Sequence, residues 1–521
     1  MMRNTPTLVR ILPVFALTLA GTAFGKSPNI LFIFADDHTI QAIGAYESWL
    51  QDFAKAHDLT PNLDRLAAQG ALFNNSFCGN SICGPSRATI LTGKHSNANG
   101  FYGNNQELKP KDGFDGGQWT FPKELQKAGY NTAIFGKWHL GSEPTGFDEW
   151  KVLPGQGHYY NPEFRTAKGM IQTSGHSTQT IANFSIEWLK QQSDDQPFLL
   201  MCQFKAPHRT WMPDTDQFDY LRDAVIPKPD TLHDLYQTRS SPLWHQEMEI
   251  GRHMQYEHDL KINPPLVTYD IQNPNYKRLT PEQRKTFDEF YGPRNRSFEA
   301  ANLSGLELLE FKYEEYIKDY LRCIKEIDDQ VGRLLATLEE SGLADNTMVV
   351  YSADQGFYLG EHGWFDKRWM YEESLRMPLI VRWPGKVKAG SMPKALVQNI
   401  DYAPTFLEVA GVKAPKNLHG ESMVSILKGK TPSNWRDSIY YHYYEFPGPH
   451  SVARHRGVRD DRYKLMHFYV SDEWELFDLQ EDPQEINNVY ENPNYDGIVK
   501  RLTKTMAKLE RQYNVPAKDP F

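Results

Sequence analysis

The chain has 521 residues, of which 40% are hydrophobic and 24% charged, and its formal net charge is −9. This composition is that of a globular protein, and the length favours one large domain followed by a smaller one. Because acidic and basic residues are interspersed, the sequence argues against nucleic acid or a polybasic membrane contact as a partner. An anionic substrate would therefore need a local basic pocket.

The first predicted element is an export signal over residues 1–25. Arg3 and Arg10 precede an apolar run from Ile11 to Phe24, and the small-residue sequence Ala23-Phe24-Gly25 suits cleavage. The run is too short to span a bilayer comfortably. We expect an exported protein, periplasmic or secreted, with no integral membrane span after cleavage; an uncleaved anchor is the alternative.

Strand and helix patterns alternate over the next part of the chain, residues 26–433. Short apolar runs indicate strands that are buried on both faces, at 29–35, 132–135, 198–204, 348–352 and 379–382. Helical patterns between them cover 61–67, 122–127, 178–191 and 310–340. This alternation predicts an α/β fold with a mostly parallel sheet and helices on both of its faces.

Two further segments differ in character from this pattern. Residues 211–293 are rich in Pro, Asp, His and Tyr and lack clean periodicity, so we expect a long excursion over the binding edge of the sheet. A smaller C-terminal subdomain is predicted over 434–521. Its strand patterns at 438–446, 457–466 and 474–479 and its helical pattern at 496–513 indicate a short antiparallel sheet with one helix.

Polar residues cluster directly after the buried strands. Ligands of open α/β sheets bind at the carboxyl ends of strands, so we expect these clusters to meet at one site. The residues concerned are Asp36, Asp37, Lys137, His139, His208, Asp354 and Gln355.

The acidic members of this set indicate a metal site. Asp36 and Asp37 are adjacent, and their carboxylates repel each other unless a cation neutralises them. Asp354 and Gln355 would add a carboxylate and an amide oxygen, which suits a hard divalent ion, Ca²⁺ above all. The alternative is that these are ordinary turn or capping residues.

The four cysteines differ in their surroundings. In an exported protein Cys78, Cys83, Cys202 and Cys323 could form two disulfides. Cys202 lies in an apolar run and Cys323 in a helical pattern, which favours buried free thiols there. Cys83 lies in a polar segment rich in Gly and Pro, which we expect to be a loop.

The segment around Cys83 carries a family resemblance. Cys83-Gly84-Pro85-Ser86-Arg87, continued by Leu91-Thr92-Gly93, resembles the C-x-P-S-R and L-T-G signature of formylglycine-dependent sulfatases in the alkaline-phosphatase-like superfamily. Gly136 to Gly141 resembles the family's G-K-W-H-L-G segment, and Ala206-Pro207-His208 its A-P-H element. The resemblance runs from Asn29 to about Tyr490. It implies an alkaline-phosphatase-like fold with a mixed, mostly parallel sheet.

The resemblance also implies a modification and a metal shell. A formylglycine-generating or sulfatase-maturating enzyme would oxidise Cys83 to formylglycine (3-oxoalanine). One hydroxyl of its hydrate would attack sulfur, and the other would later expel sulfate. One Ca²⁺ would be held by Asp36, Asp37, the modified Cys83, Asp354 and Gln355, the last standing where the family most often has Asn.

The remaining catalytic roles follow from the same resemblance. Lys137 and Lys367 would bind sulfate oxygens, His139 would deprotonate the diol, and His208 would face the leaving oxygen as a general acid. Arg87 would steady the diol and its metal environment. Taken singly, a Lys or His of this set is more often a solvated or packed side chain, but their joint occurrence in the family's order at strand ends favours the catalytic roles.

The substrate is expected to be a sulfated carbohydrate. Asp366 and Arg368 flank Lys367 and could bind sugar hydroxyls, and His442, His450, Arg454 and His455 could reach over the pocket. Residues 360–374 look like those of carbohydrate sulfatases, particularly N-acetylglucosamine-6-sulfatases of heparan or mucin breakdown. Alternatives are a phosphate mono- or diester hydrolase of the same superfamily and a non-catalytic binder of sulfated glycans.

Overall fold

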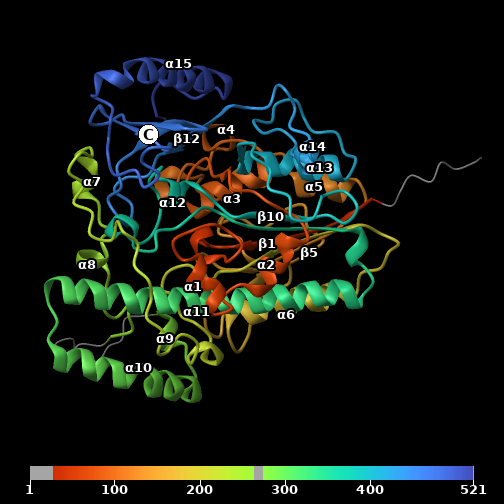
Figure 1. Ribbon diagram of the computed structural model, residues 1–521. Helices are drawn as coiled ribbons and strands as arrows, with labels where there is room; N and C mark the ends of the chain where they lie inside the picture. Colours follow the sequence, from red (N-terminus) through yellow and green to blue (C-terminus); the bar gives the residue numbers. More distant parts are fainter. Residues whose placement is uncertain (1–26, 263–273, 520–521) are drawn as a thin grey trace, which may run out of the picture.

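The computed structural model describes residues 27–262 and 274–519 (Figure 1). The predicted signal peptide, residues 1–25, lies outside the described residues. Among the helices that are described, none is both long enough and apolar enough to cross a bilayer.

A nine-stranded mixed sheet forms the centre of the molecule, in the order β2-β10-β9-β1-β8-β4-β5-β6-β7. The five inner strands from β9 to β5 are parallel, and the outer strands are antiparallel to their neighbours, which confirms a mixed sheet with a parallel centre. The inner strands are β1 (Asn29–Ala35), β4 (Asn131–Lys137), β5 (Glu149–Leu153), β8 (Phe198–Gln203) and β9 (Thr347–Ala353). The outer strands are β2 (Ala71–Leu72), β6 (Glu163–Thr166), β7 (Gly169–Gln172) and β10 (Leu379–Arg382).

Strand β1 shows why the apolar runs are continuous. All seven of its residues are buried. Leu31, Ile33 and Ala35 pack into a core on one face of the sheet, whereas Ile30 and Phe32, with Phe34, pack into a second core on the other face. A strand covered on both faces needs apolar residues at successive positions.

Helices cover both faces of the sheet, as Figure 1 shows. On one face lie α2 (Pro61–Ala68), α6 (Ser177–Leu189) and the long α11 (Gly305–Glu340). On the other lie α3 (Cys83–Thr92), α5 (Phe121–Lys127) and α13 (Tyr402–Val409). The predicted layer architecture is therefore confirmed.

The excursion predicted over 211–293 is not irregular throughout. It contains the short helices α7 (Pro242–His245) and α8 (Ile250–His253), and the longer α10 (Pro281–Ala301) begins within it. A reciprocal capping box between Thr280 and Gln283 starts α10. This helix buries only Phe287 and Tyr291 among its residues, so the sequence carries little apolar periodicity.

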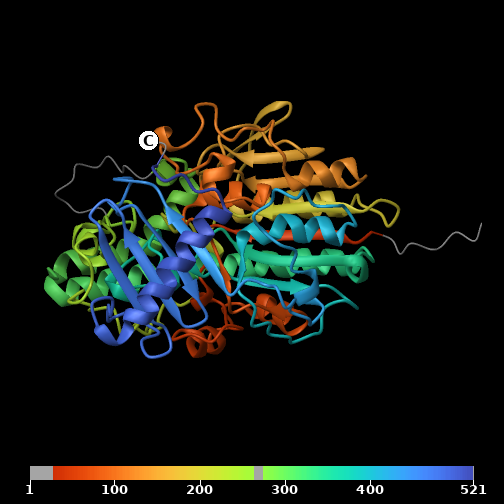
Figure 2. The same cartoon turned by 90° about the horizontal axis from the view of Figure 1, so that it is seen from above.

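A four-stranded antiparallel sheet follows, formed by β12 (Ser438–Tyr443), β13 (His455–Asp460), β14 (Tyr463–Phe468) and β15 (Glu473–Asp478). The single strand expected over 457–466 is in fact two, because Asp460 accepts backbone hydrogen bonds from Arg462 and Tyr463 and turns the chain. Helix α15 (Asp496–Gln512) packs on the outer face (Figure 2). The inner face joins the core of the large sheet. Residues 26–433 and 434–521 remain our proposed division.

Candidate active site

The polar clusters after the inner strands meet at one edge of the sheet. Lys137, at the end of β4, forms an ion pair with Asp36, which directly follows β1. Arg87 on α3 binds the carboxylate of Asp354 after β9, with its Nη2 atom 2.9 Å from Asp354 Oδ2. His208, which follows β8, places Nε2 3.8 Å from the carboxylate of Asp37. The structure thus brings together residues that lie far apart in the sequence.

Cys83 is buried and is the first residue of helix α3, not part of a loop as expected. Pro85 is compatible with this position because the first turn of a helix has backbone N–H groups without intrahelical partners. Burial and the charge of Asp36 raise the pKa of the Cys83 thiol well above its usual value. An unmodified thiol here would be a poor nucleophile, because the thiolate is the reactive form.

The other cysteines have no chemical role that the structure supports. Cys78, Cys202 and Cys323 are buried free thiols, as is Cys83. The two disulfides considered from the sequence are not formed, and the expectation of free buried thiols at Cys202 and Cys323 is confirmed.

Three carboxylates lie side by side in the site. Oxygen atoms of Asp36, Asp37 and Asp354 all lie within 4.8 Å of one another, and all three residues are buried. Burial raises the pKa of Asp354 to about 8 and that of Asp37 to about 6. Burial has the same effect on Asp36, but the charge of Lys137, together with that of Arg87, outweighs it and lowers the pKa of Asp36 well below the usual value.

This carboxylate group fits a hard cation. Asp36 Oδ1 is buried and has no hydrogen-bond partner among the described residues. Burial, with repulsion from Asp36, raises two of the three pKa values. A divalent ion would offset both effects, and carboxylate oxygens are the ligands that Ca²⁺ prefers. The donor set therefore fits the ion implied by the sequence.

Gln355 lies next to these carboxylates, and whether it offers them an oxygen or a nitrogen atom depends on the orientation of its amide. Its Nε2 atom donates to Asp37 and, over 2.9 Å, to Asp354, whereas its buried Oε1 has no partner within the described chain. A half turn of the amide exchanges these two atoms and directs oxygen to the carboxylates. Gln355 can therefore serve as an oxygen ligand.

Two buried lysines each contact a different carboxylate of this group. Lys137 contacts Asp36, and Lys367 Nζ lies 2.6 Å from Asp37 Oδ2. Lys137 also donates to Gln156 Oε1 over 2.5 Å. Sequence reasoning missed Gln156; its one signal is its place just after β5, another inner strand. Both lysines supply buried positive charge where a sulfate group could bind.

The two histidines are held in neutral forms by their surroundings. Burial, reinforced by the charge of Lys137, lowers the pKa of both His139 and His208 well below the usual value. His208 Nδ1 donates to the carbonyl of Arg209 over 2.7 Å, which leaves Nε2 toward Asp37. Nδ1 of His139 is buried with no hydrogen-bond partner in the described part of the chain.

Asp366 and Arg368 lie on either side of Lys367, and we call them the sugar-facing pair after the sugar-binding role that the sequence predicts for them. Arg368 Nε donates to Asp366 Oδ1 over 3.0 Å. His450 Nε2 lies 3.2 Å from Asp366 Oδ2, and Glu445 Oε2 lies 3.5 Å from Arg368 Nη1. Of the C-terminal candidates, His450 contacts this pair, whereas His455 accepts a hydrogen bond from the Met370 backbone and His442 pairs with Tyr440. No pattern in the sequence marks Glu445.

Four of the site residues have left-handed backbone conformations. The φ angles are 70° for Asp37, 55° for His139, 76° for Asp366 and 96° for Arg368. Such conformations are uncommon for residues other than glycine and cluster at functional sites, where the surrounding structure enforces them. The fold therefore holds these side chains in directions that relaxed strands or helices would not give.

Comparison with known proteins places this site in a family. The sulfatase family model matches residues 28–412, and a model described as N-sulphoglucosamine sulphohydrolase, C-terminal, matches residues 360–512. The chain is 43% identical over 527 residues to an N-acetylglucosamine-6-O-sulfatase of Bacteroides thetaiotaomicron, covering 98% of this chain and 92% of that protein. It is 26% identical over 530 residues to an arylsulfatase of Clostridium perfringens, covering 92% and 94%.

A solved structure shows the same likeness in three dimensions. It is described as a complex with its substrate, D-glucosamine-2-N,6-O-disulfate, and superposes with a TM-score of 0.89 at 43% identity, covering 95% of this chain and 100% of that one. The family resemblance seen in the sequence is confirmed. The chain belongs to the sulfatase family and is a sulfuric ester hydrolase.

Proposed function

We propose that this sulfatase removes the 6-O-sulfate of glucosamine or N-acetylglucosamine in a sulfated glycan, of the glycosaminoglycan or mucin type, and releases inorganic sulfate. The observation that carries the proposal is the split arrangement around Lys367. Lys367 points to Asp37 in the carboxylate group, whereas the sugar-facing pair turns to His450 and Glu445. A sugar sulfate ester would suit this arrangement, because its sulfate group is anionic and its sugar ring carries hydroxyls.

The similar proteins support this choice of sugar. The relative that is 43% identical is named for 6-O-sulfated N-acetylglucosamine, and the similar solved structure holds a 6-O-sulfated glucosamine. Bidentate contacts from a carboxylate and a guanidinium suit neighbouring sugar hydroxyls. The sugar-facing pair, together with Lys137, His208 and Lys367, forms the proposed substrate site.

We assign the metal and the modified residue to the same carboxylate group. Asp36, Asp37, Asp354, Gln355 and the formylglycine made from Cys83 would hold one Ca²⁺. When present, the hydrated aldehyde supplies one hydroxyl to attack sulfur and another to release sulfate, and calcium stabilises the negative charge there. The raised pKa of the Cys83 thiol supports a modified nucleophile over a native thiolate.

The cationic residues stabilise charge as the S–O bond to the sugar breaks. Lys137 and Lys367 would bind the sulfate oxygens; their contacts with Asp36 and Asp37 in the carboxylate group support this role. Arg87 binds Asp354, the Lys137 carbonyl over 2.7 Å and Gln203 over 2.9 Å, so it fixes the relative positions of three strand ends. Preorganised positive charge of this kind lowers the barrier because it needs no rearrangement during the reaction.

The two histidines handle protons on opposite sides of sulfur. His208 would give a proton to the sugar oxygen that leaves, since its Nε2 faces the site. His139 would take a proton at position 83, since its Nδ1 is buried near Lys137 and Asp36. For both rings an approaching sulfate monoanion favours the protonated form, which opposes the effect of burial.

The biological setting follows from the sequence. We propose that the protein is exported by the segment 1–25, to the periplasm or beyond, and that a formylglycine-generating enzyme modifies Cys83. No sequence or structural feature described above favours nucleic acid or a membrane as a partner.

Sulfate release from a panel of sulfated sugars tests the proposal. We expect the mature enzyme to release sulfate from 6-O-sulfated N-acetylglucosamine or glucosamine faster than from isomers sulfated elsewhere. Paired aryl sulfate and aryl phosphate substrates form the control for reaction class. A strong preference for aryl phosphate, or for a sugar sulfated at another position, would contradict the proposed substrate.

A further inference from the structure

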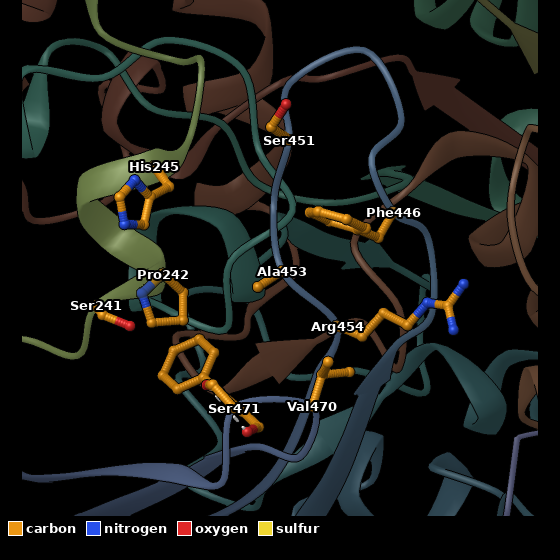
Figure 3. A pocket seen from close by; sticks show the side chains of 10 residues that line it. Ser241, Pro242, His245, Phe446, Ser451, Ala453, Arg454, Val470 and Ser471 are labelled. Carbon is orange, nitrogen blue, oxygen red and sulfur yellow. Dashed lines mark hydrogen bonds between the residues drawn. The ribbon is translucent and has the colours of Figure 1, made fainter.

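A cavity of about 410 Å³ lies between helix α7, the loop of residues 444–454 and the turn after β14. This volume is within the range of roughly 300–1,000 Å³ that is usual for small-molecule sites. In Figure 3, Pro242 and His245 on α7 lie on one side, Phe446 and Arg454 on the other, and Ala453 between them. Phe468, Val470 and the serines 241, 451 and 471 complete the lining.

The cavity shares its walls with the proposed sugar site. Glu445 and His450 contact the sugar-facing pair, and the residues that follow each of them, Phe446 and Ser451, line the cavity. The segment after α7 is fixed to the same loop, since the Glu247 amide donates to the His450 carbonyl over 2.7 Å. One loop therefore contacts the sulfated sugar through some residues and borders the cavity through their neighbours.

The lining is largely apolar, with an exposed aromatic ring and two polar side chains, His245 and Arg454. Phe446 and Val470 are large apolar side chains with 51% and 74% of their surfaces exposed. An exposed aromatic ring offers a flat face to the C–H face of a pyranose. His245 and Arg454 add a hydrogen-bonding ring and a positive charge at the rim, which suit hydroxyls and an anionic substituent.

We propose that this cavity binds a second sugar residue of the substrate, the one linked to the sugar that loses its sulfate. Its pyranose ring packs on Phe446, and a carboxylate or sulfate on it faces Arg454. The inference rests on the proposed function, because it requires the sulfate ester to be carried by a glycan. The specificity of the enzyme would then depend on the neighbouring sugar of the glycan as well as on the sugar that carries the sulfate.

Comparing a monosaccharide with a disaccharide tests the subsite. The probes are 6-O-sulfated N-acetylglucosamine and the same sugar linked to a uronic acid. We expect kcat/KM for the disaccharide to exceed that for the monosaccharide by about tenfold in the unaltered enzyme. Phe446→Ala should reduce this ratio to near one, chiefly through KM of the disaccharide. Met392→Ala, at an exposed apolar residue outside the cavity, is the matched control and should keep the ratio.

Charge in the cavity gives a second, independent measurement. Arg454→Gln and Val470→Glu should each weaken turnover of the uronic acid disaccharide relative to one whose second sugar is neutral. Thermal unfolding of each variant shows whether it is folded. These comparisons use ratios between two substrates, so a general loss of activity does not imitate the expected result.

The outcomes separate the two proposals. Absence of sulfate release from both sugars in mature enzyme would overturn the proposed function, and the subsite with it. Equal kcat/KM for both sugars in the unaltered enzyme, or an equal loss on both in Phe446→Ala, would overturn the subsite alone. An apolar peptide that binds the cavity while the disaccharide does not compete for it would also overturn the subsite.

Discussion

The imidazole of His450 lies 3.2 Å from the carboxylate of Asp366, and this contact joins the C-terminal part of the chain to a residue next to Lys367. The ring of His450 also stands at 90° to that of Phe365, and its Nδ1 donates to the Glu247 carbonyl over 2.9 Å. The loop 444–454 is thereby fixed against the sugar-facing pair.

Removal of His450 should therefore weaken sugar binding more than sulfate chemistry. We expect His450→Ala to raise KM for 6-O-sulfated N-acetylglucosamine by about tenfold, which is the value of a hydrogen bond to a charged group. Activity on a small aryl sulfate should change less than about twofold, since that substrate has no sugar hydroxyls. His442→Ala, in the interior of the C-terminal sheet, is the control. Equal losses of His450→Ala on both substrates would contradict this role.

Substitutions of Cys83 should distinguish the attack on sulfur from the later release of sulfate. Cys83→Ala should abolish turnover and leave the unfolding temperature nearly unchanged. Cys83→Ser keeps a hydroxyl but has no second hydroxyl to expel sulfate, so it should stop as a sulfate ester detected by mass spectrometry. Steady turnover by the serine variant at the original rate would refute the two-hydroxyl scheme, as would an unmodified thiol in active protein.

Calcium should stabilise the folded protein as well as support activity. Added Ca²⁺ should raise the unfolding temperature of chelator-treated protein, because an ion that binds only the folded state stabilises it. Asp36→Asn should remove most of this rise, since it removes a ligand and a negative charge. Gln355→Asn keeps an amide oxygen and should retain the response, whereas Gln355→Leu should lose it. If Ca²⁺ raised the unfolding temperature of Asp36→Asn as much as that of the unaltered protein, Asp36 would not be a ligand of the ion.

The buried pair of His176 and Glu326 should make stability fall as the pH rises. His176 Nδ1 lies 2.7 Å from Glu326, and its Nε2 lies 2.9 Å from the Met212 carbonyl, so both ring nitrogens face acceptors. Burial lowers the pKa of His176, but the charge of Glu326 and the hydrogen bonds outweigh it and raise the pKa from 6.5 to about 9.

A raised histidine pKa means that the folded state binds more protons than the unfolded state, so its contribution is complete below pH 6.5 and is lost as pH rises through 9. The pKa of Glu326 is raised mainly by burial, which has the same sign. Denaturant titrations should show a loss of up to about 3 kcal/mol between these pH values. His176→Gln should flatten the profile, and a profile unchanged in that variant would exclude the pair as its source.

Gly136, which directly precedes Lys137, should not tolerate a side chain. Its φ is 108°, and a Cβ atom there would collide with the carbonyl oxygen of Gln203 on β8. Gly136→Ala should lower the free energy of unfolding by at least about 3 kcal/mol and displace Lys137. Gly129→Ala has a similar φ of 89° but open space around it, so its cost should be only about 1 kcal/mol. Similar losses for both would show that backbone strain, and not the collision, sets the cost.

The central sheet and the site edge could be predicted from the sequence because both depend on local patterns. A continuous apolar run such as that of β1 specifies burial on two faces, and parallel strands necessarily place Asp36 and Asp354 at the same edge. The carboxylate group therefore follows from strand order alone. A metal site could be predicted here because two adjacent buried carboxylates repel each other unless a cation neutralises them.

The parts that could not be predicted depend on long-range packing. Helix α10 buries too few apolar residues to show a period, and Gly84-Pro85 gave Cys83 the composition of a loop although it begins α3. Glu445 and Gln156 act through contacts with residues distant in sequence, and no local pattern marks them.

The position of the loop 444–454 has an evolutionary consequence. Apart from Lys367, the groups that we propose for sulfate chemistry follow inner strands or stand on α3. Part of the proposed sugar-binding surface, in contrast, belongs to a connection between β12 and β13. Connections of this kind tolerate insertion and replacement far better than buried strands. A lineage of such enzymes can thus acquire new glycan preferences by exchanging a dozen or so residues, while the desulfating machinery is inherited intact.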